Sequence, residues 1–401
     1  MSGNDKWPMA PKLRFPEFVG QRLREVPLKD VTAESTVRNG DSVSTMPVMG
    51  VSKTDGIVPM EERLIASDIA RYKIVQKDWF AYNPMRLNIG SIAQWKGEHD
   101  ILVSPDYVVF KCLDDADFGV DSSYLNHFRQ SDAWENFVNE GGDGGVRVRI
   151  YYKDLSRLRL ALPCSDEQQK IADCLSSLDE MITTEIRKLD ALNTHKKGLM
   201  QQIFPRVGES VPRLRFPEFQ EADEWEEKNL GDVCNMQSGK FIAATEISEI
   251  FSEGLYPCFG GNGLRGYTKT FNQSGRYSLI GRQGALCGNV NLAEGNFYAT
   301  EHALVTTPKL GVVTDWLFHN LNFLDLNRFA TGQAQPGLSV EVLEKIACAV
   351  PKDEEEQRLI ANCLSSIDDF ITNQAQKIEA LKIHKKGLMQ KLFPVLDEVF
   401  A

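Results

Sequence analysis

Apolar residues recur in alternating steps of four and three along two stretches of the chain, which is the period of a heptad seam on an α-helix. The first stretch lies between Pro163 and Pro205, and the second lies between Pro351 and Pro394. The pattern therefore predicts two long helices. The seam positions are Ile171, Leu175, Leu178, Ile182, Leu189, Leu192, Leu199 and Ile203 in the first, and Ile360, Leu364, Ile367, Ile371, Ile378, Leu381, Leu388 and Leu392 in the second.

Both predicted helices contain polar interruptions of the seam at matched positions. The first seam is interrupted at Glu185 and Lys196, and the second at Gln374 and Lys385. Matched polar residues of this kind tend to fix the register of a helix pair. The helix starts have the spacing of capping boxes, formed by Ser165 with Gln168 and by Asp353 with Glu356.

The two helical stretches are copies of one another. "HKKGLMQQIFP" at residues 195–205 returns as "HKKGLMQKLFP" at 384–394, and 19 of the 32 positions in 174–205 are identical in 363–394. A second repeated motif, "LRFPEF", stands at 13–18 and again at 214–219. The chain thus reads as a motif, a variable region and a helix, written twice.

Each helix, at about 37 residues, would be about 55 Å long for a rise of 1.5 Å per residue. An exposed Leu/Ile seam of that length is unfavourable in water, so the simplest arrangement packs the two seams together. Because each helix follows an equivalent domain, an antiparallel pair would give the chain a pseudo-twofold axis. The alternative is that each helix is buried separately in its own domain.

The variable regions, residues 20–162 and 220–350, mix short strand-like runs with Gly, Pro and Asn turns and a few helical stretches. This mixture predicts an α+β domain in each region. Both regions place an Arg-bearing Gly loop, a Gly-rich loop, a short helix and a proline in the same order. We therefore expect the two folds to match while their loops differ.

The composition is that of a soluble globular protein of two or three domains, with 401 residues, 42% hydrophobic and 25% charged. No stretch resembles a signal peptide or a membrane span, so we expect a cytoplasmic protein with no membrane partner. The eight cysteines form no C-x-x-C pair, which favours reduced structural thiols. A formal net charge of −11 argues against binding of bare DNA by electrostatics alone.

Motifs of catalysis and cofactor binding lack their required context. Gly261, Gly263 and Gly266 satisfy G-x-G-x-x-G, but no apolar helix follows, so a dinucleotide site is not expected. "NPMR" at 83–86 lacks the second proline and the aromatic ring of the amino-methyltransferase motif. The sequence holds no P-loop and no histidine at metal-ligand spacing with another ligand. No catalytic, cofactor-binding or metal site is predicted.

Loops rich in Arg, Asn and Gln are the remaining candidates for chemistry, because Arg can pair with guanine, Asn and Gln with adenine, and Lys with phosphates. For any single residue, a solvated loop side chain remains the alternative. The candidates are Arg86, Asn88, Gln94, Arg147, Arg149 and Lys153 in the first region, and Lys240, Asn262, Arg265, Lys269, Arg282, Gln283, Gln333 and Gln335 in the second.

Local charge limits this interpretation. Residues 20–162 carry 18 basic and 21 acidic side chains, and residues 220–350 carry 9 and 15. A DNA-binding surface must therefore be a local basic stripe, or partner proteins must hold the phosphates.

With repeats, helices and loops taken together, the chain resembles the specificity subunit of a type I restriction-modification system. The resemblance covers essentially the whole chain. It rests on the paired "CLSS(L/I)D…HKKGLMQ(Q/K)(I/L)FP" segments, both "LRFPEF" motifs, the helix entries at 163–168 and 351–357, and "LIGRQGALCGNV" at 279–290 with "GGNGLRGYT" at 260–268.

The resemblance implies an α+β chain with two target-recognition domains joined by a pair of long antiparallel coiled-coil helices, in a pseudo-twofold internal repeat. Each domain would read half of a bipartite double-stranded DNA target through the major groove, and the helices would set the gap between the halves. The implied ranges are target-recognition domain 1 with its LRFPEF segment (1–162), spacer helix 1 with the second LRFPEF segment (163–219), target-recognition domain 2 (220–350) and spacer helix 2 (351–401).

The resemblance also implies partners and a noncatalytic role. Two methyltransferase subunits would dock on this chain, and restriction subunits that translocate DNA would complete the complex. No cofactor is expected in this subunit, whereas S-adenosylmethionine, ATP and Mg are expected in the partners. Partners that hold the phosphates would also account for the acidic balance of this chain.

Two alternatives stay open. One is a noncatalytic protein-interaction scaffold with a coiled-coil spacer. We expect few exposed aromatic side chains in the loops, which favours DNA, because protein-binding hot spots are rich in Trp and Tyr as well as Arg. The other is an enzyme with an unrecognised site, which methyl transfer or DNA cleavage by the isolated chain would reveal.

Overall fold

The computed structural model describes residues 11–41, 44–113, 119–140, 149–206, 208–332 and 336–394. The chain divides into two compact units: unit 1 comprises residues 1–185 and 377–401, and unit 2 comprises residues 186–376. Both units combine helices with sheets, which confirms the α+β expectation. The division runs through both long helices, so the four predicted domain ranges stay a prediction.

Unit 1 builds its variable region from short strands: β1 (Arg24–Pro27), β2 (Thr32–Ser35), β3 (Met49–Ser52), β4 (Gly56–Pro59), β5 (Lys73–Val75), β6 (Phe80–Tyr82), β7 (Ile92–Gln94), β8 (Ile101–Val103), β9 (Val108–Cys112) and β10 (Arg159–Leu162). A four-stranded sheet has the order β2-β9-β6-β7, and the pairs β1-β10, β3-β4 and β5-β8 form two-stranded sheets. The helices are η1 (Pro16–Phe18), α1 (Leu28–Val31), η2 (Glu62–Leu64), η3 (Leu87–Ile89), α2 (Ser122–Phe128), α3 (Asp132–Glu140) and α4 (Tyr152–Leu155).

Unit 2 contains a six-stranded sheet with the order β12-β17-β15-β16-β13-β14, and the separate pair β11-β18. The strands are β11 (Glu226–Asn229), β12 (Cys234–Ser238), β13 (Tyr256–Gly260), β14 (Gly263–Thr268), β15 (Gln273–Gly281), β16 (Val290–Ala299), β17 (Ala303–Pro308) and β18 (Ala347–Val350). The helices are η4 (Pro217–Phe219), α6 (Leu230–Val233), η5 (Ala244–Glu246), α7 (Thr314–Phe323), η6 (Leu326–Phe329) and α8 (Val340–Leu343).

Two long helices, α5 (Ser165–Ile203) and α9 (Glu354–Leu392), each run for 39 residues, as the heptad pattern predicts. Every predicted seam residue is buried or half-buried. None of the helices that the structure describes is both long and apolar enough to cross a membrane.

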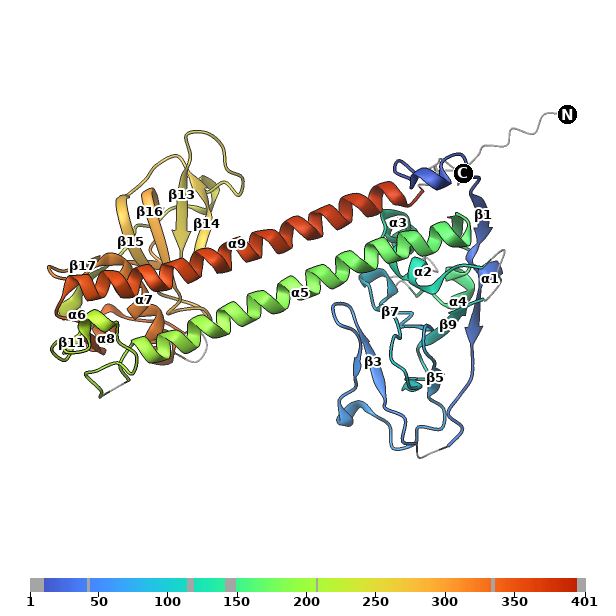
Figure 1. The fold of residues 1–401 in the computed structure, drawn as a ribbon, viewed down its shortest axis with the longest axis horizontal. Coiled ribbons are helices and arrows are strands. Elements are labelled where there is room, and N and C mark those ends of the chain that lie inside the picture. The colour runs from blue at the N-terminus through green and yellow to red at the C-terminus, as the bar shows by residue number, and fades with distance from the viewer. Residues whose placement is uncertain are drawn as a thin grey trace. The chain divides into compact units, whose positions relative to one another are not determined.

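The cores of both units include both helices. In unit 1, Leu175 of α5 and Leu392 of α9 belong to one apolar cluster with the sheet residue Phe110, and Figure 1 shows α2 and α3 beside these helix ends. In unit 2, Ile203 of α5 and Leu364 of α9 share a cluster with α7. Each long helix therefore contributes apolar residues to the cores of both units.

Two of the polar interruptions of the seams, Lys385 and Lys196, form ion pairs between the two helices. In unit 1, Lys385 of α9 lies 2.7 Å from Asp179 of α5. In unit 2, Lys196 of α5 lies 2.5 Å from Asp368 of α9. A partly buried ion pair at one position in an apolar seam penalises shifted registers, which would leave a charge unpaired.

The two LRFPEF motifs attach to the helices through buried arginine–glutamate pairs. In unit 1, Arg14 donates to both carboxylate oxygens of Glu167, at 2.7 and 2.6 Å. In unit 2, Arg215 makes the same paired contact with Glu356, at 2.7 and 2.8 Å. The same motif therefore anchors the start of α5 in one unit and the start of α9 in the other.

The predicted capping boxes at the helix starts are only half correct. The Asp353 carboxylate does accept a hydrogen bond from the Glu355 backbone N–H at 2.8 Å. Glu356 binds Arg215 instead of the cap. Gln168 donates to the Pro163 and Gly119 carbonyls, so it ties the helix to the preceding chain. These tertiary partners outcompete the local reciprocal bond.

A buried histidine joins each variable region to one long helix. In unit 1, His127 Nε2 lies 3.0 Å from Ser176 Oγ, and in unit 2, His319 Nε2 lies 3.1 Å from Ser365 Oγ. The two side chains are only 2% and 0% exposed. Burial lowers the pKa of His127 to about 4 and that of His319 to about 3, with neighbouring Lys385 and Lys196 adding to the effect. Both rings are therefore neutral at pH 7.

The order Ser176, His127, Asp179 resembles the catalytic triad of hydrolases, but the geometry does not fit one. His127 Nδ1 makes no hydrogen bond and lies 3.8 Å from Asp179, which instead pairs with Lys385. A triad aspartate must accept from the ring to orient it, and the ring must be open to substrate. The group therefore acts as a packing contact between α2 and α5.

Acid is expected to destabilise the chain through these two histidines. Because their folded pKa values are lowered, only the unfolded chain takes up the protons as pH falls below about 6.5, and the loss continues down to the folded values. Between pH 7 and pH 5 the free energy of unfolding should fall by about 2 kcal/mol for each ring. Urea unfolding curves at both pH values measure this loss.

His319→Gln should remove about half of that pH-dependent loss, whatever its effect at pH 7. His195 on α5 is exposed, so His195→Gln provides the control for a His-to-Gln change outside a buried site. A wild-type slope that His319→Gln does not reduce would contradict a buried neutral ring.

Candidate nucleic-acid interface

Four segments of unit 2 that are distant in sequence meet at one end of its sheet: residues 238–241, 260–265, 281–283 and 300–302, together called the loop cluster. Ser238 Oγ donates to the Glu301 carbonyl at 2.9 Å and lies 3.4 Å from Arg282 Nη1. The Arg282 backbone N–H donates to the His302 carbonyl at 2.9 Å. Asn289 donates to Asn262 at 2.9 Å. The sheet therefore places Arg282 beside the loops that carry the other candidates.

Glycine is required where the loop segments cross. A Cβ on Gly281 would lie 1.9 Å from the Gly261 carbonyl oxygen, and a Cβ on Gly239 would lie 2.2 Å from the Ala299 carbonyl oxygen. Both neighbours are backbone atoms, which cannot move without displacing their segments. The glycines of "LIGRQGALCGNV" and "SGKF" thus serve close packing of the loops.

The loop cluster is basic although its domain is acidic. Its four segments carry Lys240, Arg265 and Arg282 against the single acid Glu301. Lys240, Arg265, Asn262 and Gln283 are exposed, and Arg282 is half-buried. Unit 2 therefore contains a local basic surface of the kind that the sequence led us to expect.

The other predicted residues of unit 2 lie apart from the loop cluster or outside the described residues. Lys269 follows β14, whose far end pairs Thr268 with Tyr256, so it stands at the opposite end of the β13-β14 hairpin from Asn262. Gln333 and Gln335 lie outside the described residues.

In unit 1, two candidate segments lie side by side. The Ile150 backbone N–H donates to the Pro84 carbonyl at 3.0 Å, which brings Arg149 next to the turn that carries Arg86. Arg86, Arg149 and Lys153 are exposed and Asn88 is half-buried. Arg147 lies outside the described residues.

The prediction for Gln94 is wrong. Its side chain lies on β7 with 7% exposure, and its amide donates to Ser122 at 3.0 Å and to Asp78 at 3.3 Å. A strand residue whose amide is held inside the domain offers no edge to a base. Residue type alone grouped Gln94 with the loop candidates, and residue type carries no sign of burial.

The sequence did not indicate Lys53. This lysine lies in the β3-β4 hairpin, and the fold brings it next to residues 83–90 of unit 1. A Cβ on Gly90 would lie 3.4 Å from the Lys53 side chain, and Lys53 is exposed. Lys53 stands between β3 and β4, and no local pattern relates that turn to residues 83–90. Only the tertiary fold supplies the signal.

The expectation of few exposed aromatic side chains is also wrong. Phe241, Phe251 and Phe271 of unit 2 are 75%, 61% and 45% exposed, and Tyr151 of unit 1 is 44% exposed. Composition does not reveal this, because the buried and exposed aromatics look alike in sequence. The exposed aromatic side chains therefore weaken the argument against the protein-interaction scaffold.

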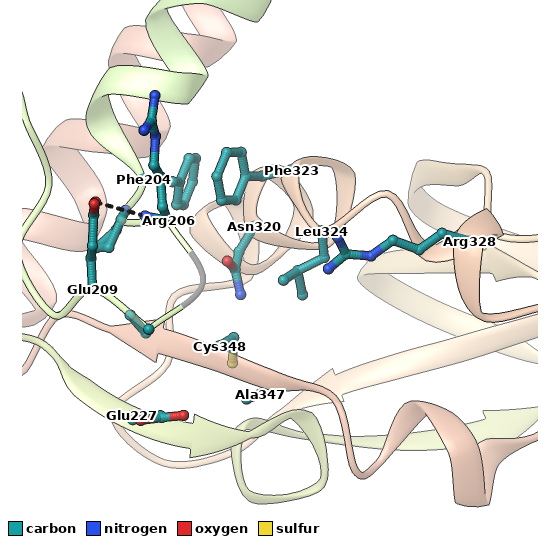
Figure 2. A pocket seen from close by; sticks show the side chains of 13 residues that line it. Phe204, Arg206, Glu209, Glu227, Asn320, Phe323, Leu324, Arg328, Ala347 and Cys348 are labelled. Carbon is teal, nitrogen blue, oxygen red and sulfur yellow. Dashed lines mark hydrogen bonds between the residues drawn. The ribbon is translucent and has the colours of Figure 1, made fainter.

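A cavity of about 280 Å³ in unit 2 lies between the end of α5, α7 and β18. Figure 2 shows Asn320 between Phe323 and Cys348, with Arg328 extending toward Leu324. Burial raises the pKa of the Cys348 thiol to about 11, so it is a poor nucleophile at neutral pH. No histidine lines this cavity, and no metal-binding cluster of His, Cys, Asp or Glu occurs among the described residues. The cavity gives no support to the enzyme alternative.

The GxGxxG segment forms a turn of the sheet. Gly261 lies between β13 and β14, and Gly263 and Gly266 belong to β14. No helix begins at this segment, so the helix N-terminus that would hold a dinucleotide phosphate is missing from it. Its glycines instead allow β14 to approach Ser248 closely.

Residues 222–382 match the family described as the type I restriction modification DNA specificity domain. The chain is 45% identical over 160 residues to the type I restriction enzyme EcoprrI specificity subunit of Escherichia coli, a match that covers 40% of this chain but only 39% of that relative. It is 24% identical over 364 residues to the putative type I restriction enzyme MjaX specificity subunit of Methanocaldococcus jannaschii, covering 82% and 81% of the two chains.

Among solved structures, the S subunit of a type I restriction-modification system from M. genitalium superimposes with a TM-score of 0.63. The match covers 96% of this chain and 100% of that chain at 15% sequence identity, so it shows a similar fold. The family match over residues 222–382, the named relatives and the shared fold agree: the chain is similar to type I restriction-modification specificity subunits.

Proposed function

We propose that this chain is a noncatalytic DNA-recognition subunit. It reads a bipartite double-stranded target and scaffolds the methyltransferase and restriction subunits of a type I restriction-modification complex. The observation that carries the proposal is the loop cluster of unit 2, a basic surface of Lys240, Arg265 and Arg282 on an otherwise acidic domain. Arg side chains on fixed loops suit bidentate contacts with guanine in the major groove.

In this proposal α5 and α9 form one antiparallel coiled coil, and the two target-recognition domains are related by a pseudo-twofold axis. The ion pairs support it: Asp179 pairs with Lys385, and Lys196, 17 residues further along α5, pairs with Asp368, 17 residues earlier on α9. The matched Arg14–Glu167 and Arg215–Glu356 contacts support it as well. A rigid pair of helices would then set the gap between half-sites.

The chemistry of the complex is proposed to lie in the partners. Methyltransferase subunits would bring S-adenosylmethionine, and restriction subunits would bring ATP and Mg. Two methyltransferases would fit the repeated motif and helix, because each copy offers an equivalent surface. With phosphates held largely by partners, an acidic chain needs only a few base-reading side chains.

The test is methylation-site mapping by single-molecule sequencing of genomic DNA. Cells would co-express this chain with its neighbouring methyltransferase gene. A two-part methylated motif with a fixed unread gap is expected. A continuous motif, or no new methylation beside a demonstrably active partner, would overturn the proposal.

The second candidate is a protein-interaction scaffold, and the exposed Phe251 and Phe271 favour it. Exposed aromatic rings are typical of protein-binding hot spots. The same mapping separates the two, since a scaffold would give no sequence-specific methylation.

Arg282→Ala is expected to weaken DNA binding by about 1 to 3 kcal/mol and to relax one position of one half-site, as the loss of a bidentate base contact does. Binding of the assembled methyltransferase to duplexes that vary at single positions measures it. Arg276→Ala is the control, because Arg276 is engaged with Asp315 at 2.7 Å and lies on β15 away from the loops. An equal loss on every sequence would mean that Arg282 holds a phosphate.

A further inference from the structure

Phe241 is the most exposed aromatic side chain among the described residues, at 75%. Its neighbour Ile242 is 6% exposed, and Lys240 on the other side is exposed to solvent. The ring therefore stands in water between a residue anchored in the domain and a cation. A single exposed apolar residue is common on protein surfaces. Only the residues around Phe241 can therefore indicate a function for it.

The backbone on both sides of Phe241 is held in place. The Lys240 N–H donates to the Ala299 carbonyl at 2.9 Å, and the Tyr298 hydroxyl donates to the Phe241 carbonyl at 3.0 Å. Gly239 lies so close to Ala299 and Thr300 that a Cβ there would collide with both carbonyl oxygens. Two residues at the end of β16, Tyr298 and Ala299, thus hold the backbone that carries the ring, and a backbone that is already ordered loses little entropy on binding.

The segment that carries the ring contacts the proposed base-reading residue through Ser238. Ser238, three positions before Phe241, contacts Arg282 through its hydroxyl and Glu301 through its hydrogen bond to the main chain. The loop cluster therefore holds Phe241, Lys240 and Arg282 on connected segments of one unit. A ligand that binds both Lys240 and Arg282 would lie over the segment that carries Phe241.

We propose that Phe241 makes an apolar contact with a base pair next to the one read by Arg282, and so determines sequence at that position. This inference rests on the proposed function. The cations select a phosphate-bearing partner, and the apolar groups of DNA that a ring can reach are the C5-methyl of thymine and the face of an unstacked base. Lys240 would hold the phosphate adjoining that step.

The test uses the assembled methyltransferase, purified after co-expression of this chain with the neighbouring methyltransferase gene. Duplexes with randomised positions would be bound, recovered and sequenced for the wild type, Phe241→Ala and Phe241→Leu. Phe241→Ala should lose about tenfold of the preference at one position of one half-site and leave the other half-site unchanged. Phe241→Leu should retain part of it.

Two arms distinguish the apolar groups. If the contact is with a methyl, replacing the preferred thymine by uracil should reproduce the tenfold loss in the wild type. If the ring enters the stack, uracil should bind normally, and 2-aminopurine at that step should brighten with the wild type but not with Phe241→Ala.

Phe271→Ala is the matched control, because Phe271 is exposed but packs against Tyr256 beyond the far end of β14. It should keep the wild-type preferences. Identical preferences in Phe241→Ala and the wild type would overturn the inference, and so would weaker co-purification of the methyltransferase with unchanged preferences, which would identify a protein contact. A wild-type complex without any base preference would instead overturn the proposed function itself.

Discussion

Glu356→Ala is expected to lower the free energy of unfolding by about 3 to 5 kcal/mol, the usual cost of breaking a buried ion pair by removing one partner. The side chains of Arg215 and Glu356 are only 8% and 2% exposed, and both carboxylate oxygens accept from the guanidinium. The indole N–H of Trp225 also donates to Glu356 at 3.2 Å. Alanine would leave the buried Arg215 cation with only the Ala222 and Asp223 carbonyls and no counter-charge, and it would remove the acceptor of the Trp225 indole N–H. Urea unfolding of the purified chain measures the loss.

Controls for this variant lie in the same turn of α9. Glu354 pairs with Arg358 on the exposed surface of the helix, so Glu354→Ala should cost only about 0.5 kcal/mol. The double variant Arg215→Leu with Glu356→Leu should be less destabilised than Glu356→Ala, because no lone charge stays buried. Equal losses for Glu354→Ala and Glu356→Ala would show that the pair does not hold the LRFPEF segment.

The long helices were predictable because their signal is local and repeated. Heptad spacing, prolines at both ends and a duplicated sequence specify α5 and α9 within a few residues. Even the seam interruptions at Lys196 and Lys385 could be assigned a register role, and the structure supplies their partners, Asp368 and Asp179. Periodicity averages over many residues, so no single exception misleads it.

The contacts that attach the variable regions to the helices were not predictable. His127 and Ser176 are 49 residues apart, and His319 and Ser365 are 46 apart. A lone histidine in a helix carries no sign of its burial or of its partner. The predicted capping bond of Glu356 is absent for the same reason, since its partner Arg215 lies 141 residues away in the chain.

The candidate interface was predictable in residue type but not in place. Arg, Asn and Gln in glycine-rich loops indicated Arg282 and Asn262, which lie on two segments of the loop cluster, and their contact with DNA stays a prediction. Gln94 had the same composition around it and is buried. Phe241 was overlooked because an aromatic residue is expected in a core, and only the structure shows it in solvent.

Deleting one heptad from both long helices is expected to shorten the unread gap of the methylated motif by up to about three base pairs. Seven residues correspond to about 10 Å of helix, and one base pair to about 3.4 Å of duplex. Suitable deletions are residues 184–190 and 373–379, which lie at equivalent positions of the repeat and remove the Glu185–Lys377 pair as a whole. Methylation-site mapping in cells reads the gap directly.

The deletion keeps the helices in phase, because seven residues complete two turns of a coiled coil and every remaining seam residue keeps its face. The ion pairs Asp179–Lys385 and Lys196–Asp368 lie outside the deleted residues and stay in register. Deleting 184–190 alone is the control: the helices would then differ in length, one of these pairs would be lost, and methylation should fail. A double deletion that methylates the original motif with its original gap would show that the helices do not set the spacing, however well they fold.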